Sequence, residues 1–139
     1  MKIKFFFILI LNCIFYISET NSEEKVFIEL TIENEIITNL DIYKEKNYLI
    51  ALNNNLKNLD KKQIYKISKD SLIREKVKKI ELLKYFDLNS SCKIADNILK
   101  TAIKNLNFKN DKEFEIYLED YDLTINDVKK KLLIEATWN

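Results

Sequence analysis

The side chains that most often carry acid–base or nucleophilic chemistry are scarce in this sequence. It contains no histidine, and its two cysteines are Cys13 and Cys92. A serine or cysteine nucleophile activated by histidine is therefore excluded, as is every histidine-ligated metal site. Glycine is also absent, so no glycine-rich loop can bind a phosphate group. From these residues we predict no catalytic, metal-binding or cofactor-binding site.

The composition nevertheless predicts a folded domain. The chain has 139 residues, of which 47% are hydrophobic, enough for one domain with a core and too many for a disordered chain. Proline is absent as well as glycine. Turns that need a left-handed backbone must therefore use other residues, and asparagine is the one we expect most often.

The first 22 residues resemble a signal peptide. Lys2 and Lys4 precede an apolar run from Phe5 to Ile17, and small residues that could lie at a cleavage site follow it. This run of thirteen residues, broken only by Asn12, is short for a membrane span and typical of a signal-peptide core. We therefore predict export to the periplasm with cleavage near Ser22, and an uncleaved membrane anchor is the alternative.

The mature chain, residues 23–139, would be close to neutral, which disfavours nucleic acid as a partner. Cys92 would be its only cysteine, so no internal disulfide can form. An exported protein without disulfides suits a bacterial envelope compartment. We expect Cys92 to be a small buried hydrophobic residue.

The pattern along residues 23–139 predicts a mainly α fold with a β-hairpin at its start. Val26–Ile32 and Glu35–Ile37 are rich in β-branched residues and are separated by two turn residues. Five segments with helical hydrophobic spacing follow. They are expected from Asn39 to about Leu52, from after Asp60 to about Phe86, from after Ser90 or Ser91, from after Asn110 or Asp111, and from after Thr124, with Asn53–Asn55 ending the first.

Three stretches together resemble the N-terminal domain of the SurA family of periplasmic chaperones and peptidyl-prolyl isomerases. "IENEIITNLDI" (Ile32–Ile42) is similar to the family's hairpin and first helix. "SLIREKVKKIELLKYFDL" (Ser71–Leu88) is similar to its long helix, and "YDLTINDVKKKLLIEATWN" (Tyr121–Asn139) resembles the end of the domain. The chain departs from the family in using Asn and Asp where the family tends to use Gly, as at Asp122.

The resemblance implies a chaperone domain that binds unfolded outer-membrane protein precursors. Family members continue into parvulin-type isomerase domains, and none follows within these 139 residues, so we expect no enzymatic activity from this chain. A fragment of a full-length peptidyl-prolyl isomerase is one alternative, and a small helical interaction protein of the envelope is another. The possible peptide-binding residues are the aromatics Tyr43, Tyr48, Phe108, Tyr117 and Trp138.

The resemblance also implies that a C-terminal strand and helix cover the hairpin in the family. We therefore expect Val26–Ile32 to have an exposed edge, and the first and fifth helices to share an uncovered apolar face. Strict alternation would turn Phe27, Glu29 and Thr31 to one side of this strand and the residues between them to the other. The missing segment or a second copy of the chain is the expected partner of this surface.

Overall fold

The fold was obtained as a computed structural model that describes residues 25–88 and 92–139. The predicted signal peptide and the predicted caps Ser90 and Ser91 lie outside the described residues. The elements in chain order are β1 (Ile28–Ile32), β2 (Glu35–Thr38), α2 (Asn39–Leu52), the 3-10 helix η1 (Asn54–Asn58), α3 (Lys61–Leu82), α4 (Cys92–Asn105), α5 (Asp111–Glu119) and α6 (Ile125–Trp138). This order confirms the predicted mainly helical chain with an N-terminal two-stranded hairpin, whereas the SurA-like domain fold stays a prediction.

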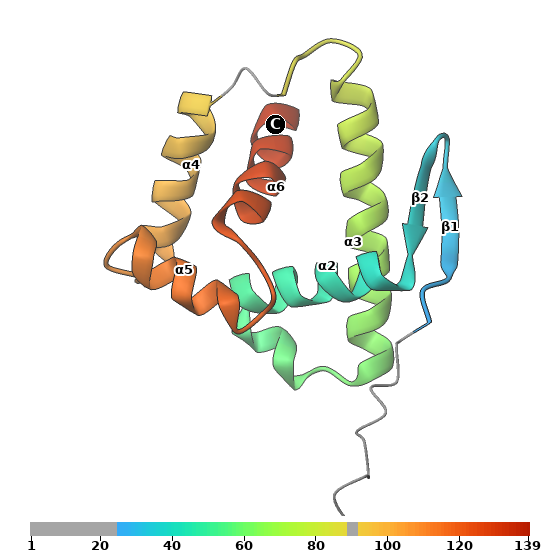
Figure 1. The fold of residues 1–139 in the computed structure, drawn as a ribbon, viewed down its shortest axis with the longest axis horizontal. Helices are drawn as coiled ribbons and strands as arrows, with labels where there is room; N and C mark the ends of the chain where they lie inside the picture. The colour runs from blue at the N-terminus through green and yellow to red at the C-terminus, as the bar shows by residue number, and fades with distance from the viewer. Residues whose placement is uncertain (1–24, 89–91) are drawn as a thin grey trace, which may run out of the picture.

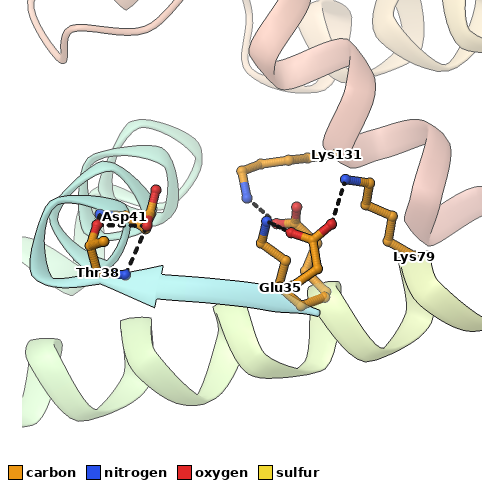
Figure 2. A network of polar contacts seen from close by, with 7 residues as sticks. Glu35, Thr38, Asp41, Lys79 and Lys131 are labelled. Carbon is orange, nitrogen blue, oxygen red and sulfur yellow. Dashed lines mark hydrogen bonds and ion pairs between the residues drawn. The ribbon is translucent and has the colours of Figure 1, made fainter. Parts of the chain in front are cut away.

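A capping box joins the hairpin to the first helix, as the sequence predicts. The backbone N–H of Asp41 donates to the Thr38 hydroxyl at 3.2 Å, and the backbone N–H of Thr38 donates to the Asp41 carboxylate at 2.8 Å (Figure 2). Two N–H groups that a helix start leaves without partners are satisfied in this way. The chain therefore changes from strand to helix at a single residue.

The expected alternation along the first strand is wrong, because the ladder is irregular between Ile28 and Leu30. Leu30 and Ile32 pack on Ile37, whereas Ile28 is exposed. The irregularity lets Glu29 reach α3, where Lys69 Nζ lies 2.7 Å from its carboxylate. A bulge of this kind shifts side chains between the two faces of a strand.

The left-handed positions agree only in part with those that the sequence suggests. Asn53 ends α2 in an extended conformation, and its side chain accepts a hydrogen bond from the backbone N–H of Asn55 at the start of η1. Positive φ angles occur instead at Glu33, Asn107 and Asp122. Asp122 thus takes the left-handed conformation at the position where the SurA pattern has Gly, whereas only one of the three residues is an asparagine.

Helix α3 is the longest described element and lies beside the hairpin, α2 and α6 (Figure 1). The Asp60 carboxylate caps it by accepting from the backbone N–H groups of Lys62 and Gln63. It ends at Leu82, not at Phe86, and its 22 residues span about 33 Å. The hairpin, α2 and α6 all contact it, so α3 fixes their positions relative to one another.

Two groups of buried side chains form the core. The smaller one joins Ile37, Ile42 and Leu72, from the hairpin, α2 and α3. The larger one connects α2 with α4, α5 and α6 and consists of Tyr48, Ala51, Leu99, Ile103, Phe114, Leu118, Leu123 and Val128. Helix α2 contributes to both, so its position depends on packing on two sides.

The last two helices begin at the caps that the sequence indicates. The Asn110 side chain accepts from the backbone N–H of Glu113 at 2.9 Å at the start of α5. Thr124 and Asp127 form a capping box at the start of α6, which runs to Trp138. Helix α6 packs between α3 and α4, which lie on either side of it in Figure 1.

Candidate functional site

A groove of about 430 Å³ lies where α2, η1 and the first turns of α3 meet. Its volume is within the range of small-ligand and peptide-side-chain sites. The residues that line it are Asn39, Ile42, Tyr43, Lys46, Ile50, Leu56, Lys57, Leu59, Lys61, Ile64 and Tyr65. Five aliphatic side chains, two tyrosines and three lysines are thus combined in one concave surface.

The groove has an aliphatic base and more exposed aromatic side chains. Ile42 and Ile64 are buried, whereas Tyr43 is 41% exposed. The Lys46 ammonium lies 4.2 Å from the centre of the Tyr43 ring, a cation–π contact that holds both side chains in place. An apolar group that entered the groove would therefore be covered by aliphatic carbon and flanked by a tyrosine ring.

Tyr65 separates the groove from the hairpin. Its hydroxyl donates a hydrogen bond to the Glu29 carboxylate of β1, which raises the pKa of Tyr65 to about 12. Glu29 also accepts from Lys69, and mainly for that reason the pKa of its carboxyl group is lowered. These bonds fix the Tyr65 ring from the far side of the groove, so the ring is already in position for a ligand.

Asn39 holds the chain that leads into β1 against the start of α2. Its side-chain oxygen accepts from the Phe27 N–H at 2.9 Å, and its side-chain nitrogen donates to the Lys25 carbonyl at 3.2 Å. Its backbone N–H also donates to the Phe27 carbonyl at 3.1 Å. Asn39 therefore continues the hydrogen bonding of the hairpin up to one edge of the groove.

The three lysines of the groove come from three different elements. Lys46 lies in α2, Lys57 in η1, and Lys61 is the first residue of α3. None of the three forms an ion pair with a carboxylate among residues 25–88 and 92–139, although five lysines farther along α3 and its end do. No aspartate or glutamate lines the groove. The groove is consequently cationic.

Only one of the five predicted peptide-binding residues lies in this groove. Tyr43 lines it, whereas Tyr48 is buried in the larger core. Phe108 and Tyr117 pack against that core, with ring centres 4.8 Å apart. Trp138 is 45% exposed at the end of α6, with Lys78 Nζ 6.0 Å from its ring centre. The structure therefore does not bring the five residues together.

The buried members of that set hold helices together. The Tyr117 hydroxyl donates to the Ala51 carbonyl at 2.9 Å and thereby joins α5 to α2. Burial and the neighbouring Tyr121 hydroxyl raise the pKa of Tyr117 to about 12, whereas a hydrogen bond from Lys57 lowers the pKa of Tyr121. Tyr117 and Tyr121 do not line the groove, and Lys57 is the groove residue that contacts Tyr121.

Sequence reasoning missed most of the groove. Leu56 and Leu59 lie in the stretch "NNNLKNLD", where the sequence predicts only a helix end at Asn53–Asn55 and a cap at Asp60. Two leucines three residues apart between asparagines could have indicated a short helical turn with an apolar side. Tyr65 gave no signal at all, because its importance depends on the distant Glu29.

The hairpin carries a second exposed apolar surface. Val26, Phe27, Ile28 and Ile36 are all exposed, although the Glu29 and Glu35 carboxylates on the same hairpin contact lysines of α3. Figure 2 shows Glu35 with Lys79 reaching it from α3. The first helix exposes Tyr43 and Leu40, and the last exposes Trp138, so exposed apolar residues are scattered along these helices.

Two further observations concern only the described part of the chain. No group of three or more potential metal ligands occurs within residues 25–88 and 92–139. In the same ranges, no helix has both the length and the apolar character that a membrane crossing requires. The side chain of Cys92 lies outside the described part, so its predicted burial stays a prediction.

Comparisons with known proteins identify no relative of this chain. A scan against known protein families finds no match, and searches of curated proteins and of solved structures find no significant similarity to the chain.

Proposed function

We propose that this chain is a chaperone-type domain of the bacterial periplasm that binds unfolded outer-membrane protein precursors and has no catalytic site of its own. The observation that carries this proposal is the groove between α2, η1 and α3, which combines aliphatic, aromatic and cationic side chains on one concave surface. The resemblance of the amino-acid sequence to the SurA N-terminal domain supports the same function.

The chemistry of the groove suits reversible binding of an extended chain. Burying one aliphatic or aromatic side chain contributes roughly 1.5–3 kcal/mol, part of which is offset by ordering the ligand. A groove that covers one or two such side chains therefore binds weakly, as release of a precursor requires. Barrel precursors alternate apolar and polar side chains, so they offer many equivalent segments to such a site.

The experiment is an aggregation assay with an unfolded outer-membrane barrel protein. The chain should slow aggregation at micromolar concentration, and Tyr43→Asp should weaken this effect because it places a charged group at the aromatic side of the groove. Tyr85→Asp is the matched control, because Tyr85 is 73% exposed and lies outside the groove. Equal activity of both variants and the parent chain would contradict the assignment to this groove.

Catalysis is tested in parallel. The chain should not accelerate the cis/trans exchange of an X-Pro peptide, whose uncatalysed relaxation time is tens of seconds or more. Clear acceleration of this exchange would show that the chain is an isomerase and not a binding domain alone.

A further inference from the structure

We propose that the groove selects peptide segments whose apolar side chains are flanked by aspartate or glutamate. This inference rests on the proposed function, since it names the class of segment that the same groove takes. It is carried by the distribution of charge around the groove: three lysines line it and no acidic residue does.

The three ammonium groups are not neutralised by described carboxylates. Lys46 lies over the Tyr43 ring, and Lys57 Nζ lies 5.4 Å from the centre of the Tyr121 ring. These contacts with neutral rings position the two lysine side chains but do not neutralise their positive charge. Most lysines that α3 presents to the hairpin and to α6 are paired with glutamates, for example Lys69 with Glu29. Lysines without an ion pair to a described carboxylate also occur outside the groove, so what distinguishes the groove is that three of them line one apolar surface.

The start of α3 adds no positive charge to the groove beyond Lys61 itself. A helix N-terminus carries a partial positive charge, and Lys61 is the first residue of this helix. The nearby Asp60 carboxylate accepts from the N–H groups of Lys62 and Gln63 at 2.8 and 2.9 Å, so it is already engaged as the cap. The Asp60 carboxylate thus offsets the partial charge of the helix N-terminus, and the ammonium of Lys61 is the group there that attracts a ligand carboxylate.

The arrangement favours a peptide over an amphiphile with a single anionic head group. Lys46, Lys57 and Lys61 come from three separate elements that meet at the groove, so the groove offers three cationic groups to one ligand. A peptide with acidic residues on both sides of an apolar one can use several of these charges at once. A fatty acid has one carboxylate and can use fewer.

The test measures binding of three fluorescein-labelled peptides by anisotropy. They share a Leu-Phe-Leu centre and differ only in flanking residues, which are aspartates, asparagines or lysines. The acidic peptide should bind about tenfold more tightly than the asparagine peptide, because several partly exposed ion pairs each add a modest amount. Raising the ionic strength from about 0.05 M to about 0.5 M should remove most of this preference.

Variants of the chain assign the preference to the groove. Replacing Lys46, Lys57 and Lys61 by Gln should bring binding of the acidic peptide down to that of the asparagine peptide. The control replaces Lys62, Lys66 and Lys112 by Gln, which changes the net charge equally outside the groove and should keep the preference. Far-UV circular dichroism of both variants verifies that they are folded.

The possible failures are distinguishable. Equal binding of acidic and asparagine peptides would overturn this inference and leave the proposed function standing. No binding of any peptide would overturn both. Loss of the preference in the control variant would show that net charge and not the groove is responsible, and tighter binding of laurate than of the acidic peptide would show that the groove is an amphiphile site.

Discussion

The Lys131 ammonium of α6 lies 2.6 Å from the carboxylate of Glu45 in α2, a side chain that is only 2% exposed. Glu75 of α3 contacts the same ammonium, so one cation joins three helices (Figure 2 shows Lys131 reaching from α6). Burial alone would lower the pKa of Lys131, but the two carboxylates outweigh it and the pKa is raised. This contact fixes α2, and α2 carries Tyr43 and Lys46 of the groove.

Removal of this cation should destabilise the fold strongly. Lys131→Ala leaves the Glu45 and Glu75 carboxylates close together without their counter-ion, which should cost about 3–5 kcal/mol of unfolding free energy. Urea unfolding measures the loss. The matched control is Lys130→Ala, because Lys130 is exposed and should change stability by less than about 0.5 kcal/mol. A similar small effect of both variants would contradict a structural role for Lys131.

Acid should weaken the attachment of the hairpin to α3. The pKa of Glu29 is lowered mainly by its hydrogen bond with Lys69, and that of Glu35 mainly by its hydrogen bond with Lys76. Because both pKa values lie below the usual 4.5, these contacts stabilise the folded chain fully above pH 4.5. Their contribution is lost as the pH falls through the lowered values.

Urea midpoints at about pH 7 and about pH 3 measure this dependence. The double variant with Glu29→Gln and Glu35→Gln should lose less stability between the two pH values than the parent chain does. If the variant and the parent chain lost equal amounts, other carboxylates would be responsible for the acid sensitivity.

Phe114 should be the most sensitive aromatic residue of the larger core. Its side chain is 0% exposed and lies 5.2 Å from Phe108, measured between ring centres. Phe114→Ala should cost about 3–5 kcal/mol through the cavity that it leaves. Ile116→Ala in the same helix is the control, because Ile116 is 58% exposed. Thermal unfolding in which both variants melt at the parent temperature would show that this core is not a source of stability.

The capping box at Thr38 should stabilise α2 measurably. Thr38→Ala removes the hydroxyl that accepts the Asp41 N–H, and loss of such a cap costs about 1–2 kcal/mol. Thr101→Ala is the control, since the Thr101 hydroxyl is exposed and bonds only to the Asn97 carbonyl of its own helix. Hydrogen exchange should show faster opening of α2 in the first variant alone. Unchanged exchange there would contradict the assigned cap.

Local signals were enough to predict the two strands and the five α-helices of this fold, but not η1. The caps at Thr38, Asp60, Asn110 and Thr124 are short-range contacts between residues a few positions apart, so the sequence displays them directly. The end of α3 was misplaced, because apolar residues such as Phe86 continue the periodicity beyond the helix although the chain turns there. The bulge near Glu29 depends on α3, which the strand alone does not reveal.

The candidate site was much less predictable. Of the predicted contact residues, Tyr43 lines the groove, but Tyr48 and Tyr117 serve the packing of α2 against its neighbours. The presence of an aromatic residue does not distinguish a ligand-contacting position from a core position, because both positions use the large apolar area of the ring. The groove arises where α2, η1 and α3 meet, and the positions of these elements relative to one another depend on tertiary packing, although the Asn53 cap that begins η1 is a local contact.

The most direct test of the account is site-specific photo-crosslinking in the groove. With p-benzoylphenylalanine in place of Lys57, an unfolded outer-membrane barrel protein should form a covalent adduct with the chain, because Lys57 lines the groove. The same probe in place of Lys112, which is exposed on α5, should form little adduct. Equal crosslinking at both positions, or none at position 57, would contradict the claim that this groove binds unfolded chains.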